Sequence, residues 1–203
     1  MKIFCIGFQK TGTTSLGIAF EKLGYRVCGV CHELLPDLIK GNLDNIKEFV
    51  DTCDVFKDNP WPVLYRELDT MYPGSTFILT MRNESDWIRS VINHFASTPS
   101  EMLRYIYGVP YPEGHKDVFL NRYRQHHTEV LAYFKDRPSD LLVLDLETGN
   151  PWEKIAPFIG IDIPAFPFPH ANKGAYTRLG KIRKYLLKRI RARWRNFRKP
   201  DPG

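Results

Sequence analysis

One short segment of the chain combines the residue types that bind phosphate groups. The segment Gly7–Ser15 carries one lysine, Lys10, beside a glycine and several hydroxyl residues, between an apolar stretch and a helical pattern. Backbone N–H groups in such a loop, together with the positive end of the following helix, favour an anion. Gly12 lets the backbone approach a ligand closely, and Lys10 adds a full positive charge. The segment is therefore a candidate anion-binding loop.

The order of residues in this loop limits which ligand it can take. ATP- and GTP-binding loops place the lysine directly after the second glycine. Here Thr13 follows Gly12, and Lys10 lies two residues earlier. This order argues against an ordinary ATP or GTP loop, and an ordinary helix start with a nearby surface lysine is an alternative interpretation.

A second candidate binding group follows the strongest apolar run of the chain. Arg82 stands directly after that run, and Ser90 lies in the helical pattern that comes next. An arginine fork and a hydroxyl at the end of a buried strand suit a phosphate group. Two alternatives stay open: Arg82 could pair with Glu84 or Asp86 on the surface, and Arg89 could take its role.

Strand and helix patterns alternate along the chain and would position both groups. The expected strands are Lys2–Phe8, Tyr25–Val30, Asp54–Lys57, Thr76–Met81 and Leu141–Leu144. Helical spacing of apolar residues is found in the segments 16–23, 43–50, 87–95, 117–135 and 152–159. No hairpin signal joins neighbouring strands, which predicts a parallel sheet covered by helices on both faces. Ligands of such sheets bind at the carboxyl ends of the strands.

These two groups together resemble a known family. Lys-x-Gly-Thr-Thr after the first strand is similar to the 5′-phosphosulfate loop of sulfotransferases that use 3′-phosphoadenosine 5′-phosphosulfate (PAPS). Arg82, followed eight positions later by Ser90, resembles the 3′-phosphate motif of that family. The similarity spans roughly Lys2 to Gly174. Within the family, the chain resembles a divergent branch found in bacteria and eukaryotes. The resemblance implies a three-layer α/β/α fold like that of P-loop NTPases. The residues expected to bind the nucleotide are Gln9, Lys10, Thr11, Gly12, Thr13, Thr14, Ser15, Arg82 and Ser90.

The resemblance implies transfer of a sulfuryl group from PAPS to a hydroxyl or amine, with PAP as the product. Lys10 would stabilise the bridging oxygen of the leaving group, and no metal is expected. Asp58, near the end of the third strand, is the candidate base, although an Asx turn before Pro60 or a cap for the helix that follows are together an equally good explanation. The rival candidates for the base are His94, Glu67 and His170. Two other functions stay open: a small-molecule kinase with an atypical loop, or a nucleotide-binding protein without turnover.

The cysteines suggest other chemistry but do not complete a site. Cys28-x-x-Cys31-His32 matches the pattern for haem attachment, yet no second axial ligand is evident. Zinc would need a further pair of ligands, and none is suitably spaced. Four cysteines without an export signal indicate reduced, structural thiols and a cytoplasmic protein. We expect Cys28 and Cys31 to be buried beside a strand.

Charge separates the end of the chain from its body. The 203 residues carry a net charge of +6, but eleven of the 29 basic residues lie from Arg178 onward, with a single acidic residue. The preceding segment holds 18 basic and 22 acidic residues. We therefore expect a catalytic domain over 1–176 and a basic amphipathic helix over 177–203.

The partners expected from composition are few. The basic helix could dock on the body, or residues 178–199 could meet an anionic membrane surface or an acidic partner. No nucleic acid is expected, because base-stacking platforms are absent from the sequence. The acceptor would be a small molecule or a glycan, and Tyr105–Gly114 is either an acceptor wall or a surface loop.

Composition, with 43% hydrophobic and 26% charged residues, excludes a disordered or membrane-spanning chain.

Overall fold

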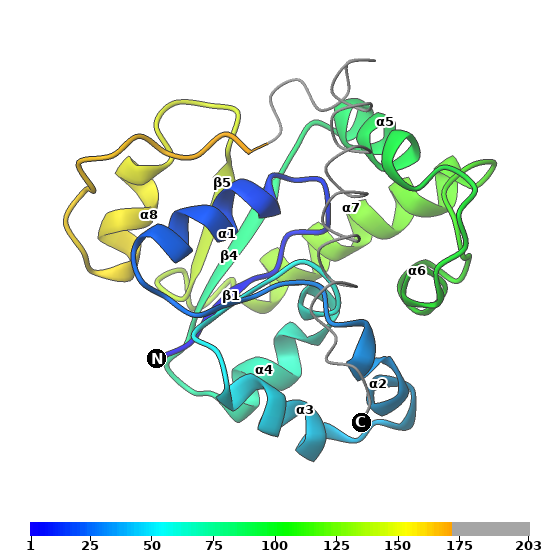
Figure 1. The fold of residues 1–203 in the computed structure, drawn as a ribbon, viewed down its shortest axis with the longest axis horizontal. Coiled ribbons are helices and arrows are strands. Elements are labelled where there is room, and N and C mark those ends of the chain that lie inside the picture. Colours follow the sequence, from blue (N-terminus) through cyan, green and yellow to red (C-terminus); the bar gives the residue numbers. More distant parts are fainter. Residues whose placement is uncertain (172–203) are drawn as a thin grey trace, which may run out of the picture. The chain divides into compact units, whose positions relative to one another are not determined.

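The computed structural model of the chain describes residues 1–171 and contains one parallel sheet (Figure 1). Its five strands run in the order β2-β3-β1-β4-β5. They are β1 (Ile3–Cys5), β2 (Val27–Cys28), β3 (Val55–Lys57), β4 (Thr76–Met81) and β5 (Leu141–Asp145). All four pairings between neighbouring strands are parallel, as the sequence predicted.

Eight α-helices and two 3-10 turns connect the strands within the described residues. The helices are α1 (Thr13–Lys22), α2 (Leu35–Lys40), α3 (Leu43–Asp51), α4 (Tyr65–Met71), α5 (Glu84–Phe95), α6 (Glu101–Tyr107), α7 (Lys116–Tyr133) and α8 (Trp152–Ile159). The 3-10 turns are η1 (His32–Leu34) and η2 (Trp61–Leu64).

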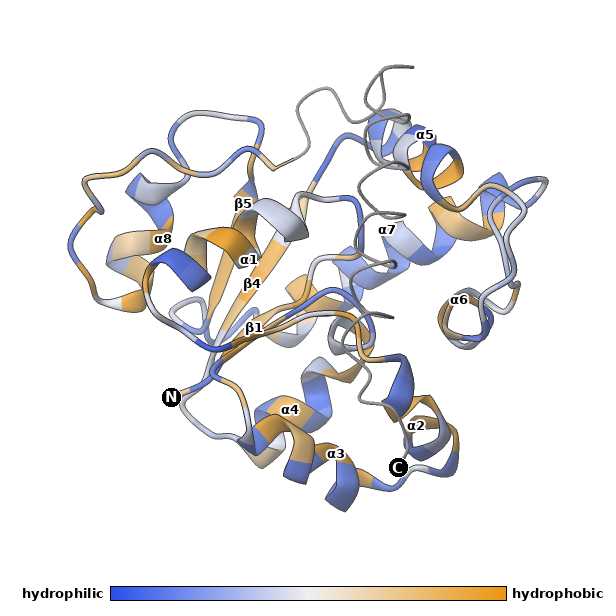
Figure 2. Cartoon of the chain, viewed as in Figure 1, coloured by the Kyte–Doolittle hydropathy of each residue, from blue (hydrophilic) through white to orange (hydrophobic). Residues whose placement is uncertain are grey.

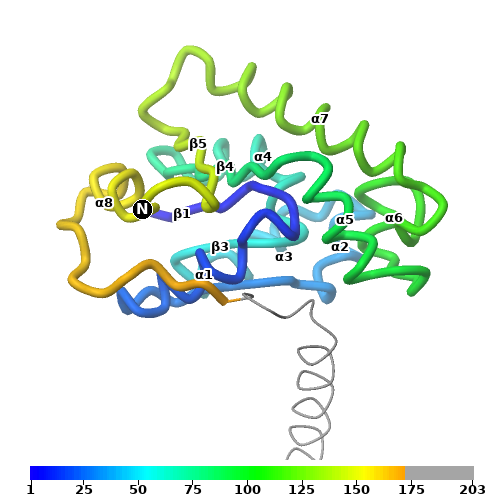
Figure 3. The backbone as a smooth tube through the Cα atoms, turned by 90° about the horizontal axis from the view of Figure 1, so that it is seen from above, coloured from blue at the N-terminus to red at the C-terminus, as the bar shows by residue number. Residues whose placement is uncertain are grey.

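The sheet is covered on both faces, so the architecture is the predicted three-layer α/β/α sandwich. Ile3 and Cys5 of β1 share a hydrophobic core with residues of α1 and α8. Phe4 and Ile6 point the other way and share a core with residues of α2 to α7. This alternation follows from the two-residue period of a strand. Figure 3 shows α1 and α7 on opposite sides of β1 and β4.

Continuous burial explains why β1 and the centre of β4 could be recognised as strands in the sequence. In β4, Phe77, Ile78 and Leu79 are fully buried, because both faces of a parallel sheet are covered. Figure 2 shows strands in mainly hydrophobic colours and helices that carry both hydrophobic and hydrophilic residues.

The predicted elements are confirmed, but several bounds move and three short helices were missed. β1 ends at Cys5 instead of Phe8 because the chain leaves the sheet to form the loop. α5 begins at Glu84 because the side chain of Asn83 accepts hydrogen bonds from two N–H groups of its first turn. The segment Tyr105–Gly114 is not simply a loop, since its first three residues end α6. The missed helices, α2, α4 and α6, have six or seven residues, too few for a clear helical period.

The chain divides after Pro169 into two compact units, Met1–Pro169 and His170–Gly203. The predicted domain boundary after residue 176 and the basic helix over 177–203 lie outside the described residues and stay predictions. Within residues 1–171, no helix is both long and apolar enough to cross a membrane.

Candidate active site

The candidate anion-binding loop leaves the central strand of the sheet at its carboxyl end, where Gly7 passes directly over β4. A Cβ atom on Gly7 would lie 2.0 Å from Oγ1 of Thr80 and 2.4 Å from its carbonyl oxygen. The adjacent N–H of Ile6 donates to the carbonyl of Ile78 at 2.8 Å. Only glycine therefore lets the loop begin this close to the neighbouring strand.

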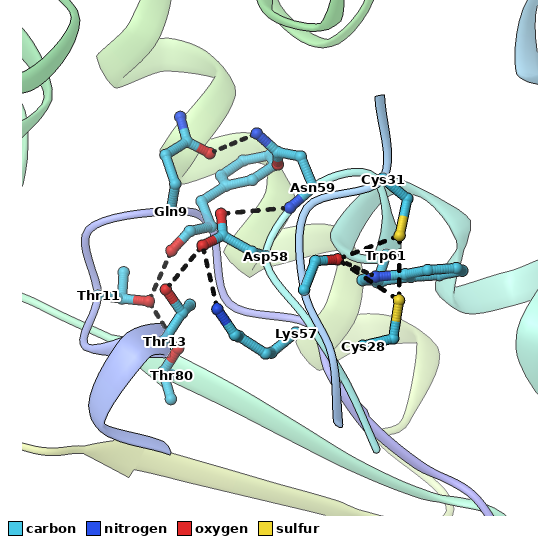
Figure 4. A network of polar contacts seen from close by, with 12 residues as sticks. Gln9, Thr11, Thr13, Cys28, Cys31, Lys57, Asp58, Asn59, Trp61 and Thr80 are labelled. Carbon is cyan, nitrogen blue, oxygen red and sulfur yellow. Dashed lines mark hydrogen bonds and ion pairs between the residues drawn. The ribbon is translucent and has the colours of Figure 1, made fainter. Parts of the chain in front are cut away.

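Hydroxyl contacts and two left-handed residues give the loop its shape. The Thr11 hydroxyl donates to the carbonyl of Phe8 at 2.6 Å and lies 2.6 Å from the Thr80 hydroxyl (Figure 4). Lys10 has φ 72° and Gly12 has φ 98°, which turn the chain into α1. Thr11 is buried, so its hydroxyl shapes the loop; its predicted contact with a nucleotide stays a prediction.

The loop leads into a helix start suited to a negative charge. Gly12 is the N-cap of α1 and has no side chain to cap the first turn, which also contains no acidic residue. The positive end of the helix dipole is therefore not neutralised by side chains of its own first turn. Thr14 is exposed, Lys10 and Ser15 are partly exposed, and Thr13 is buried.

Asp58 follows β3 and meets the start of α1. Its Oδ2 atom accepts a hydrogen bond from the Thr13 hydroxyl at 3.1 Å and lies 3.9 Å from Nζ of Lys57. Both side chains of this ion pair are largely buried, with 15% of Asp58 and 19% of Lys57 exposed. Because β1 and β3 are parallel neighbours, their carboxyl ends bring Asp58 beside the loop. Asp58 has a φ of 71°, a value that aspartate and asparagine adopt more readily than most residues.

A buried amide network fixes the loop from another side. Nε2 of Gln9 donates to the Tyr107 hydroxyl at 2.7 Å, and Nδ2 of Asn59 donates to Oε1 of Gln9 at 3.1 Å. The indole of Trp87 donates to the Gln9 carbonyl at 2.9 Å. Both ends of the Gln9 side chain are engaged with protein groups, so it helps to position the loop, and its predicted contact with the nucleotide stays a prediction. The sequence did not indicate Asn59 or Tyr107 as a partner of Gln9, since both lie far from Gln9 along the chain.

Arg82 stands at the carboxyl end of β4 and reaches the same loop. Its Nη1 atom donates to the carbonyl of Lys10 at 3.3 Å, and Nη2 pairs with Oε1 of Glu147 at 2.8 Å. Nε is buried and has no hydrogen-bond partner among the described residues. The Tyr123 hydroxyl bridges the N–H and carbonyl of Arg82 itself, at 2.9 Å from each.

The first alternative for Arg82, a pair with Glu84 or Asp86, is not adopted, because Glu84 pairs with Arg124 and Asp86 pairs with Arg89. Arg89 is largely exposed on α5, and its role as a replacement for Arg82 stays a prediction. Ser90, the other member of the predicted motif, is buried on α5.

The other candidate bases differ from Asp58 in their surroundings. His94 is exposed at the end of α5, where its ring packs edge-on against Phe95. Glu67 is half-buried in α4, and His170 belongs to the second unit of the chain. Asp58 is the candidate with a hydrogen bond to a residue of the loop, Thr13.

A histidine that the sequence did not single out supports β1 from the opposite layer. His126 of α7 is fully buried, and its Nε2 lies 2.7 Å from the carbonyl oxygen of Ile6. Burial lowers its pKa from 6.5 to about 3, so the ring is neutral and Nε2 carries the proton that is donated to Ile6. His126 is therefore a structural support beneath the loop.

The sequence predicted that Cys28 and Cys31 are buried beside a strand. Both cysteines are buried, and Cys28 ends β2, which is shorter than the predicted strand Tyr25–Val30. Among residues 1–171, no three His, Cys, Asp or Glu side chains gather into a set that could hold a metal ion.

Comparison with known proteins agrees with this geometry. The family model of the sulfotransferase domain matches two overlapping segments of the chain, residues 2–112 and 94–177. The chain is also similar to the "Ava biosynthesis cluster protein M" of Aspergillus versicolor, with 24% identity over 238 aligned positions. That alignment covers 97% of this chain and 88% of the Aspergillus protein.

Proposed function

Because the chain belongs to the sulfotransferase family, we propose that it transfers a sulfuryl group from PAPS to a hydroxyl or amine of a small-molecule or glycan acceptor. One observation carries the proposal most directly. The two sequence motifs for the nucleotide, far apart in the chain, meet where Arg82 donates to the carbonyl of Lys10. Both motifs therefore lie at one edge of the sheet, where ligands of parallel sheets bind.

The donors at this edge suit a ligand with several negative charges. Arg82 has a buried Nε atom without a hydrogen-bond partner among the described residues. The first turn of α1 is neither capped nor neutralised by side chains of its own. The exposed Thr14 and the partly exposed Ser15 add hydroxyl groups at the same helix start. Arg82 and Ser90 would hold the 3′-phosphate, and Lys10 with the residues 12–15 would hold the phosphosulfate.

In this proposal Lys10 is the main catalytic cation. When bound, PAPS would supply the sulfuryl group and release PAP. Sulfuryl transfer builds negative charge on the bridging oxygen, and a positioned ammonium group stabilises that charge. The left-handed backbone at Lys10 and the Arg82 contact with its carbonyl hold this residue in place, which reduces the reorganisation needed during the reaction.

Asp58 is the proposed base for the proton of the acceptor. Its carboxylate lies between Thr13 of α1 and Lys57, so it is fixed beside the loop. A base must come within hydrogen-bonding reach of the acceptor, and the contact of Asp58 with Thr13 supports that placement.

Ligand preference tests the proposal without knowledge of the acceptor. We expect adenosine 3′,5′-bisphosphate to raise the melting temperature of the chain, because a ligand that binds the folded state stabilises it. Stabilisation by ATP with magnesium, and none by the bisphosphate, would contradict the proposal and favour a kinase.

Turnover then separates an enzyme from a binding protein. The chain would be incubated with PAPS and a metabolite extract, and the species that gains the mass of a sulfate group would be identified by mass spectrometry. The Lys10→Ala variant is the matched control, because it retains the fold-defining glycines. A sulfated product that forms equally with this variant would contradict the role of Lys10.

A further inference from the structure

The sulfur atoms of Cys28 and Cys31 face one another although no bond joins them. They lie 3.0 Å apart, and both residues are free thiols (Figure 4). This separation is roughly 1 Å longer than a disulfide bond. The chain therefore holds the two sulfurs close enough that bond formation needs only a small local movement.

The turn that carries the pair is anchored on the loop beside Asp58. The N–H of Cys31 donates to the carbonyl of Asn59 at 3.1 Å, and the indole of Trp61 donates to the carbonyl of Gly29 at 2.9 Å. Cys28 is itself paired with Phe56 in the sheet. These contacts hold both cysteines on one rigid turn.

The two thiols are chemically different because of their mutual hydrogen bond. The bond from Cys31 lowers the pKa of Cys28 below its usual value, against the effect of burial, and Cys53 and Lys57 lower it further. The same bond raises the pKa of the Cys31 thiol, and burial adds to the increase. Cys28 is therefore the member that forms a thiolate, and the thiolate is the nucleophilic form. It has the larger exposed fraction of the two, 8% against 2% for Cys31.

We propose that Cys28 and Cys31 form a redox-active dithiol that a hydroperoxide converts to a disulfide within this turn. The Cys28 thiolate attacks one oxygen of hydrogen peroxide, the O–O bond breaks, and the departing hydroxide takes up a proton to become water. Cys28 is then a sulfenic acid. The Cys31 sulfur attacks the Cys28 sulfur, the S–O bond breaks, and the second oxygen leaves as water with the Cys31 proton. Two thiols lose two electrons, and one peroxide becomes two waters.

A small oxidant suits the burial of the pair better than a bulky disulfide does. Metal binding by the pair is not favoured, since the described part of the chain offers no set of three ligands that includes it. The proposal does not depend on sulfotransfer, because its test reads the sulfur atoms alone.

Peptide mapping of the full chain tests the proposal. The reduced protein is treated with hydrogen peroxide, unfolded in an alkylating agent and digested with trypsin. Cys28 and Cys31 share the peptide Val27–Lys40, whereas Cys53 lies in Glu48–Lys57. We expect Val27–Lys40 to become two hydrogens lighter and resistant to alkylation, and to be restored by dithiothreitol.

Two variants make the result specific. Cys53→Ser keeps the proposed pair and should give the same disulfide, which controls for the nearby third thiol. Cys31→Ser removes the resolving thiol, so Cys28 should be trapped as a sulfenic acid by dimedone. A bond that joins Val27–Lys40 to Glu48–Lys57, or full alkylation of both cysteines after peroxide treatment of the wild type, would overturn the proposal.

Discussion

The Glu147→Gln substitution should strengthen nucleotide binding, although it removes the charge from an ion pair. Oε1 of Glu147 lies 2.8 Å from Nη2 of Arg82, the arginine proposed to bind the 3′-phosphate. An incoming phosphate must either displace this carboxylate or lie beside it with the same sign of charge. The neutral glutamine would release the guanidinium at a lower cost.

The size of the effect follows from the exposure of the pair. Arg82 is 24% exposed and Glu147 is 55% exposed, so the pair is closer to a surface ion pair than to a buried one. Such pairs contribute about 0.2 to 1 kcal/mol. Since about 1.4 kcal/mol corresponds to a tenfold change in affinity, the gain should be about 1.4-fold to 5-fold. It should shrink with added salt, which screens exposed charges.

Isothermal titration calorimetry with adenosine 3′,5′-bisphosphate measures this change. Glu153→Gln is the matched control, because it removes an equal charge from an exposed position of α8. The gain should also largely vanish when Glu147→Gln is combined with Arg82→Gln, since the coupling passes through Arg82. Weaker binding by Glu147→Gln alone would refute the reasoning and indicate that Glu147 contacts the nucleotide itself.

Four further predictions concern the loop and its supports. Lys10→Ala should lower turnover at least tenfold, or about 1.4 kcal/mol in the activation barrier, as measured in a steady-state assay with PAPS. Asp58→Asn should lower turnover but leave nucleotide affinity unchanged by calorimetry, because asparagine tolerates the same positive φ; normal turnover would assign the base to another residue. Gly7→Ala should destabilise the protein by about 1 to 3 kcal/mol or prevent folding, since its Cβ would meet the backbone of Thr80. Urea unfolding measures this change, and an unchanged midpoint would show that the contact is relieved. The pKa of His126 is about 3 in the folded chain and 6.5 in the unfolded chain, so below pH of about 6 the unfolded chain takes up a proton that the folded chain does not. As the pH is lowered, the free energy of unfolding should therefore fall by up to about 1.4 kcal/mol per pH unit. His126→Gln should lack this part of the slope.

The local sequence was sufficient to predict the sheet and the loop. Thr76–Met81 could be identified as a buried strand because its centre, Phe77–Leu79, is a continuous apolar run, as is typical of a strand covered on both faces. The position of Gly12 before a helical pattern, with Lys10 two residues earlier, was enough to locate the loop between β1 and α1 as a candidate anion-binding site. Arg82 could be placed at a strand end for the same reason. Each of these features is defined by residues that lie within a few positions of one another along the chain.

The partners of those residues depended on the tertiary structure. The sequence offered Glu84 and Asp86 as partners of Arg82, because they are near in the chain, but the fold brings Glu147 to it from the end of β5. In the same way, the fold places Asn59 and Tyr107 on Gln9.

The cysteine pair also combines a feature that the sequence predicted with one that depends on the tertiary structure. Its spacing was evident from the sequence, but the approach of the two sulfurs depends on a turn that Asn59 and Trp61 hold in place. Local pattern determines which segments become strands, helices and turns. Strand order and register determine which side chains meet, because they join segments that are distant in the sequence, and no short stretch of residues contains that information.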